Sequence, residues 1–196
     1  MSLVIEIHQR FGHISRFSQN DPELIARALQ LLRPSHVFSQ PRLLLSNGLS
    51  FSLFNTANIS RIEIPRRRPD DGAGRELLPR LFKINDESEF LQRAAELKTL
   101  INTQLSWDEP GALLRWYALL QLSGGERVFA EVESRAGLPS ERYIHLNRIF
   151  EQAVLVLERD DGGVCLVNPG LIERITAFPG LPDLPGHAIA ADHETF

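Results

Sequence analysis

The side chains that most often carry enzyme chemistry are sparse and scattered in this chain. There is one cysteine, Cys165, and none of the six histidines belongs to a His-Glu-x-x-His motif. A single cysteine excludes a multi-cysteine metal site and an internal disulfide framework, and its apolar surroundings favour a small buried side chain over a nucleophile. In the tail, His187, Asp192, His193 and Glu194 would capture a metal only adventitiously. No Gly-x-Ser-x-Gly nucleophile elbow occurs. We therefore expect no catalytic residue, no cofactor and no resident metal.

Two short segments suggest phosphate contacts. Residues 122–126, Leu-Ser-Gly-Gly-Glu, resemble the signature motif of ABC-type ATPases. Those proteins also need a phosphate-binding loop that ends in Gly-Lys-Ser/Thr, and neither Lys83 nor Lys98 follows a glycine. We therefore interpret this segment as a break between two helices. Arg66, Arg67 and Arg68 form a run that either contacts an anionic partner or belongs to a solvated loop.

Composition and charge restrict the protein class. The chain has 196 residues, 43% of them hydrophobic, which suits one or two globular domains. It contains no apolar run of about 18 residues for a membrane-spanning helix and no apolar N-terminal run for a signal peptide, so we expect a cytoplasmic protein. The net charge is −4, divided into +5 over residues 1–84 and −9 over residues 85–196. This asymmetry either marks a face for an anionic partner or arises by chance.

The first half reads as a small α+β domain over residues 1–65. Leu3–Ile7 and residues 58–64 are typical of strands, and Asp21-Pro22 begins a helix that ends before Pro34. Asn47-Gly48 predicts a hairpin turn, and Leu49, Phe51 and Leu53 alternate with serines, which predicts that their face is buried. We expect four or five mostly antiparallel strands with one helix packed on them.

The segments between and after the two halves have simple sequence patterns. Residues 66–84 are rich in charge, proline and glycine, which indicates a linker or loop. Residues 85–104 form a connecting helix whose apolar stripe begins at Phe90. From residue 176 onward the composition predicts an extended tail, and a swapped arm in a homodimer is one interpretation of it.

The second half predicts three helices followed by a hairpin. Apolar residues recur at helical spacing over 113–120, 128–136 and 144–150. Residues 154–159 and 163–167 flank a tight turn at Asp160-Asp161-Gly162. In this order, with Ala136-Gly137-Leu138 before the third helix, residues 106–172 resemble a winged helix-turn-helix. The predicted fold is therefore α+β: an N-terminal antiparallel sheet with one helix, a central helix, and a C-terminal winged helix over residues 105–175.

The resemblance implies a contact surface on the third helix and the wing. The residues it places there, together with the arginine run, are Ser140, Arg142, Tyr143, His145, Asn147, Arg159, Arg66, Arg67 and Arg68. Residues 110–178 nevertheless carry a net charge of −2, and the wing tip is mostly acidic. Because phosphate neutralisation supplies most non-specific DNA affinity, we favour a non-enzymatic interaction or regulatory module that binds a protein partner or a second copy of itself. The alternatives are a DNA-binding transcriptional regulator and an enzyme with a site between the halves.

Overall fold

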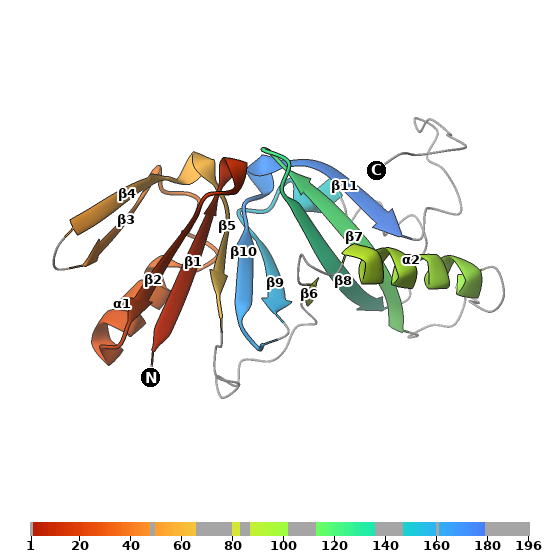
Figure 1. Cartoon of the computed structure of the whole chain (residues 1–196), viewed down its shortest axis with the longest axis horizontal. Coiled ribbons are helices and arrows are strands. Elements are labelled where there is room, and N and C mark those ends of the chain that lie inside the picture. The colour runs from red at the N-terminus through yellow and green to blue at the C-terminus, as the bar shows by residue number, and fades with distance from the viewer. Residues whose placement is uncertain are drawn as a thin grey trace.

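The computed structural model of the chain describes residues 2–47, 50–65, 80–82, 87–101, 113–135, 147–159 and 161–178. Within them, nine strands form one sheet in the order β11-β7-β8-β6-β9-β10-β5-β1-β2 (Figure 1). These strands are β1 (Leu3–Gln9), β2 (Ile14–Gln19), β5 (Ile59–Ile64), β6 (Arg80–Phe82), β7 (Leu113–Leu122), β8 (Arg127–Arg135), β9 (Leu155–Arg159), β10 (Val164–Val167) and β11 (Ile172–Phe178). Every pair is antiparallel except β6–β9. The predicted α+β class with a mostly antiparallel sheet is confirmed.

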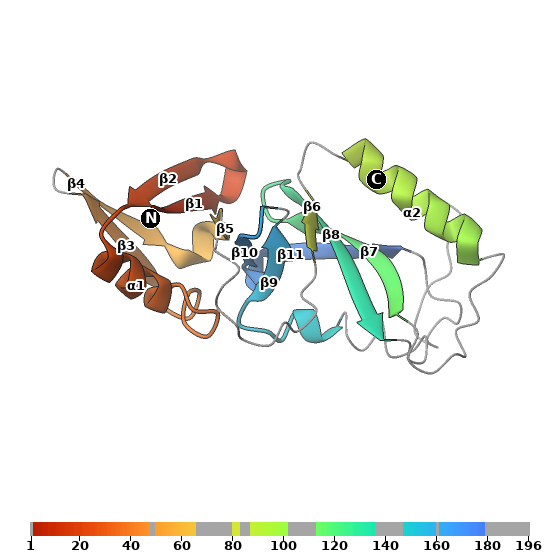
Figure 2. The ribbon, with the colours of Figure 1, turned by 90° about the horizontal axis from the view of Figure 1, so that it is seen from below.

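The remaining elements cover the two ends of this sheet (Figure 2). At one end lie helix α1 (Pro22–Leu31) and a separate ribbon of β3 (Arg42–Asn47) and β4 (Ser50–Asn55). At the other end lies helix α2 (Glu87–Ile101). Its Phe90 is fully buried against the rings of Tyr117, Phe129 and Phe178. No helix in the described ranges is both long and apolar enough to cross a membrane.

Two successive units of the chain share one order of elements. The first unit consists of a hairpin (β1–β2), a helix (α1), a second hairpin (β3–β4), the 3-10 turn η2 (Thr56–Asn58) and a last strand (β5). The second unit consists of β7–β8, a helical stretch at residues 147–149, β9–β10, the 3-10 turn η4 (Pro169–Leu171) and β11. In both units the last strand pairs with the first. The two units therefore repeat one order of elements, with β6 and α2 between them, but β3–β4 forms a separate sheet whereas β9–β10 joins the main one.

The strand register confirms this equivalence. In the first unit His8 pairs with Arg61 and Gln9 with Ile59, and in the second Gln121 pairs with Arg174 and Leu122 with Ile172. Both registers shift by one residue at the same place. Asn55 and Asn168 each cap the following 3-10 turn by accepting a backbone hydrogen bond two residues on. A shared pattern, Asn-x-x-x-Ile-x-Arg-Ile, begins at these two asparagines.

The first turns of the two units are also equivalent, and they touch. In each, a backbone N–H bonds the carbonyl four residues later, Gln9 to His13 and Leu122 to Glu126, both at 2.8 Å. Each turn has two residues at positive φ: Phe11 and Gly12 in the first, and Gly124 and Gly125 in the second. A Cβ on Gly124 would lie 2.9 Å from the backbone nitrogen of Phe11. The two units therefore meet closely at their turns.

This close approach gives a paired prediction. Gly124→Ala adds a methyl group that meets the Phe11 backbone, whereas Gly125→Ala adds one with no atom of a described residue within 4 Å. Both substitutions strain a residue at positive φ, by about 1–2 kcal/mol, but only the first also forces the turns apart. We expect Gly124→Ala to lower the free energy of unfolding by about 1–3 kcal/mol more than Gly125→Ala does. Urea unfolding of the two variants measures the difference, and equal losses would show that the turns do not pack closely.

The predicted winged helix is wrong in its first two helices. Residues 113–122 and 127–135 are the strands β7 and β8, while the hairpin predicted after them is present as β9–β10. Both faces of β7 are buried: its Trp116 and Leu120 lie in one apolar core, and its Tyr117 and Leu119 lie in another. The sequence of β7 is therefore a continuous apolar run. Such a run fits helical spacing as well as it fits a buried strand.

One predicted buried face is also inverted. The side chains of Phe51 and Leu53 are 73% and 59% exposed, whereas Phe54 from the opposite face of β4 is buried in the core. The reason is the partner strand, because Leu43 and Leu45 of β3 lie on the same face as Phe54 and pack with it against the core of the first unit.

Part of the predicted linker over residues 66–84 is also a strand, because residues 80–82 form β6.

Candidate functional site

A group of charged side chains lies on one face of the sheet near its centre. Alternation along β1 places Leu3, Ile5 and Ile7 in the core with α1 and leaves Glu6 and His8 on the opposite face. Alternation along β5 does the same for Arg61 and Glu63, which pair with His8 and Glu6 across the β1–β5 ladder. Glu126 joins from the β7–β8 turn, and Arg159 joins from the end of β9. These six residues form the charged cluster.

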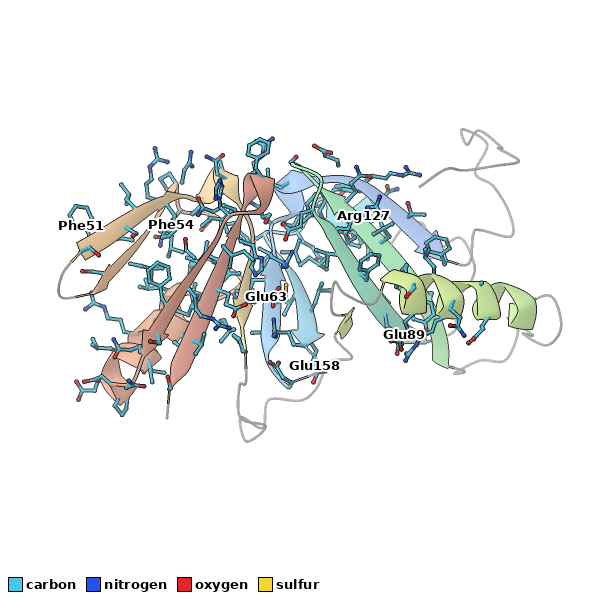
Figure 3. All side chains as sticks on the ribbon, in the orientation of Figure 1. Phe51, Phe54, Glu63, Glu89, Arg127 and Glu158 are labelled. Atoms are coloured by element: carbon cyan, nitrogen blue, oxygen red, sulfur yellow. The ribbon has the colours of Figure 1, made fainter. Side chains whose placement is uncertain are left out.

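Glu63 pairs with both arginines of the cluster, and it lies near the middle of the molecule (Figure 3). Arg61 donates from Nε to Glu63 Oε1 at 2.7 Å, and Arg159 pairs with Glu63 Oε2. The side chains of Arg61 and Glu63 are 2% and 8% exposed. Burial therefore lowers the pKa of Arg61, and the carboxylate partners offset the cost of removing this guanidinium from water.

Glu126 ties the second unit to the first. The Ser60 hydroxyl donates to Glu126 Oε2 at 2.5 Å, and Arg61 donates to Oε1 of the same carboxylate. Imidazole Nδ1 of His8 lies 3.7 Å from that oxygen. A single carboxylate from the β7–β8 turn thus contacts two strands of the other unit.

His8 is neutral at physiological pH. Its side chain is 8% exposed, and burial, together with the charges of Arg61 and Arg159, lowers its pKa from 6.5 to about 3. Among the residues that the structure describes, Nε2 has no hydrogen-bond partner. The nearest carboxylate oxygens are Glu63 Oε1 at 3.4 Å and Glu6 Oε2 at 3.9 Å. A neutral imidazole nitrogen therefore faces two carboxylates.

Beside the cluster, a cavity of about 510 Å³ opens between the two turns. Its lining combines polar side chains of the cluster with backbone of both turns and two apolar side chains: His8, Gln9, Phe11, Gly12, Ile14, Arg61, Gly124, Gly125 and Glu126. Phe11 and Ile14 are 75% and 60% exposed. The cavity therefore offers a polar floor and an apolar rim.

No family model, curated protein or solved structure matches this chain. The internal repeat offers a comparison of its own. By register, Glu6, His8 and Glu63 correspond to Leu119, Gln121 and Thr176 of the second unit. The second unit thus builds the same strands without these ionisable groups. The group of Glu6, His8 and Glu63 is therefore a property of the first unit and is not required by the order of the strands.

The structure covers only two of the nine residues predicted as contacts. Asn147 is exposed in the helical stretch after β8. Arg159 lies at the predicted wing but pairs inward with Glu63 and with Asp161, whose Oδ1 is 3.2 Å from its Nε. The other seven lie outside the described residues: Ser140, Arg142, Tyr143, His145, Arg66, Arg67 and Arg68.

Sequence reasoning missed the other five members of the charged cluster: Glu6, His8, Arg61, Glu63 and Glu126. The available signal is the alternation Ile5-Glu6-Ile7-His8 and Arg61-Ile62-Glu63-Ile64, which places the ionisable residues of each strand on one face. That pattern usually means a solvated face. Here β5 lies between β10 and β1 and is buried along its whole length.

Cys165 lies on the same face as the charged cluster, opposite Glu63 on β10. It is fully buried, and burial raises its pKa to about 12. It therefore stays a thiol at physiological pH, which suits the predicted packing role better than nucleophilic chemistry.

Proposed function

We propose that the protein is a non-enzymatic interaction module whose partner protein docks on the rim of the cavity between the two turns. The observation that carries this proposal is the conformation of Phe11. Its φ is 68°, a left-handed conformation that L residues adopt at a cost of about 1–2 kcal/mol. The equivalent residue of the second unit is Gly124, which has no such cost.

The strained residue displays its ring to solvent. Phe11 is 75% exposed, and the guanidinium of Arg10 lies 5.6 Å from its ring centroid. Strain that persists without burying the side chain is typical of functional positions. Exposed aromatic rings beside a pocket are common anchors of protein interfaces. Ile14, also on the rim, extends the apolar surface.

Two observations favour protein binding over the alternatives. Arg159, expected to contact phosphate on DNA, is instead engaged by Glu63 and Asp161. His8, on the cavity floor, is a weak base because its pKa is lowered to about 3. This favours binding over acid–base catalysis at this cavity.

The test removes the ring without removing the turn. Phe11→Gly relieves about 1–2 kcal/mol of backbone strain and adds about 0.5–1 kcal/mol of chain entropy to the unfolded state. We therefore expect stability to stay within about 1 kcal/mol of wild type. Partner binding, measured by crosslinking and affinity capture of the tagged full chain from its native host, should fall at least tenfold.

Phe51→Thr is the matched control. Phe51 is equally exposed but lies at the far end of the β3–β4 ribbon from the charged cluster (Figure 3), and threonine suits a strand. The proposal requires that the Phe51→Thr variant still captures the partner proteins that the Phe11→Gly variant no longer captures. If the partner is a second copy of this chain, analytical sedimentation should show weaker self-association for Phe11→Gly and unchanged self-association for Phe51→Thr. Identical partners on both variants would contradict the proposal.

A further inference from the structure

The charged cluster contains a buried imidazole nitrogen, Nε2 of His8, that has no hydrogen-bond partner within the described part of the chain. It faces the carboxylates of Glu6 and Glu63, and one ligand atom from each of the three residues lies within 4.8 Å of the other two. We infer that Glu6, His8 and Glu63 form a binding site for a divalent transition-metal ion of the zinc type. Of the three ligands only His8 also lines the cavity beside the proposed docking rim, and neither carboxylate does.

The distances suit such an ion. Zinc binds imidazole nitrogen and carboxylate oxygen at about 2.0–2.2 Å, so two ligands of a tetrahedral ion lie about 3.3–3.6 Å apart. His8 Nε2 is 3.4 Å from Glu63 Oε1 and 3.9 Å from Glu6 Oε2. The first distance already fits. Glu6 is the more exposed of the two carboxylates, at 16%. A small movement of its side chain toward His8 and Glu63 would bring all three ligand atoms within reach of one ion.

The second nitrogen of the imidazole is also arranged as in metal sites. A ligating histidine usually donates its other ring N–H to a carboxylate, which fixes the tautomer. Nδ1 of His8 faces Glu126 Oε1 at 3.7 Å, and that carboxylate is held in turn by Ser60 and Arg61. With the proton on Nδ1, the lone pair of Nε2 points toward Glu6 and Glu63.

The guanidinium groups set the affinity. Arg61 and Arg159 pair with Glu63, and Arg16 pairs with Glu6 through Oε1, which leaves Oε2 facing His8. Each carboxylate oxygen has two lone pairs, so it can accept from an arginine and bind an ion together. The ion competes with these positive charges, and we therefore expect weaker binding than in a structural zinc site.

Titration of the EDTA-treated, dialysed full chain with zinc chloride, followed by calorimetry and by competition with a chromophoric zinc indicator, tests the site. We expect one saturable site per chain. His8→Gln introduces the residue that the second unit has at this position, Gln121, so the fold should tolerate it. It should weaken binding by at least about 100-fold, since the loss of even an outer partner costs about 10- to 100-fold. Glu6→Gln should weaken binding at least about tenfold and keeps the test decisive if His8→Gln misfolds.

Two controls separate this site from other ligands. Glu173→Gln alters an exposed carboxylate outside the charged cluster and should bind zinc as wild type does. A His187→Gln, His193→Gln double variant removes the tail histidines and should also bind as wild type. The inference is overturned if the wild type shows no saturable site, if Glu6→Gln and a folded His8→Gln bind normally, or if the tail variant abolishes binding.

Discussion

Arg61→Met should lower the free energy of unfolding by about 3–5 kcal/mol, the range observed when one partner of a buried ion pair is removed. The guanidinium of Arg61 is 2% exposed and donates to both Glu63 and Glu126. Methionine fills similar space but leaves two carboxylates facing a low-dielectric interior with fewer donors. One carboxylate belongs to each repeat unit, so the contact between the units should weaken as well.

Arg174→Met is the matched control for this prediction. Arg174 has the same register position in the second unit, opposite Gln121, but it is exposed on β11 at the edge of the sheet. Its loss should change stability by no more than about 1 kcal/mol, as is usual for exposed pairs. Denaturant unfolding of both variants measures the contrast. Equal effects would mean that Arg61 contributes no more than a surface charge.

The difference between the two positions explains why the charged cluster could not be derived from the sequence. Asn-x-x-x-Ile-x-Arg-Ile occurs in both units, but Arg61 is buried and Arg174 is exposed. Burial depends on which strand neighbours the arginine. β5 is covered by β10 from the second unit, whereas β11 forms the end of the sheet. A pairing between segments about a hundred residues apart leaves no trace in local periodicity.

The sequence predicted an element correctly where contacts between residues close in the chain determine it. Asp21 accepts from the backbone N–H groups of Glu23 and Leu24, so α1 begins where the sequence places it. The hairpin predicted at Asn47-Gly48 is present as the pairing of β3 with β4, with Asn47 as the last residue of β3 opposite Ser50, while Gly48 lies outside the described residues. The helices predicted over β7 and β8 failed because strands buried on both faces lose the alternation that distinguishes them. The repeat itself was detectable in the two asparagine-headed patterns, but eight residues with four identities are a weak signal without the register.

His8 should make stability depend on pH below 6.5. In the unfolded chain its pKa is close to 6.5, and in the fold it is lowered to about 3 by burial and by Arg61 and Arg159. Above pH 6.5 both states are neutral at this residue, so it contributes no pH dependence. Between pH 6.5 and about 3, the unfolded state binds a proton that the native state does not, so stability falls as pH falls. The slope approaches about 1.4 kcal/mol per pH unit, and the total reaches at most about 5 kcal/mol.

His8→Gln should remove this component of the slope, while His36→Gln, which alters an exposed histidine, should retain it. Glu6, Glu63 and Glu126 also face the imidazole, and their protonation in acid affects the wild type and both variants. The relevant quantity is therefore the difference between the unfolding curves of metal-free wild type and His8→Gln from pH 7 to pH 4. A constant difference across that range would mean that His8 charges in the folded protein. In that case the imidazole would be a third cation among the arginines below about pH 6.5.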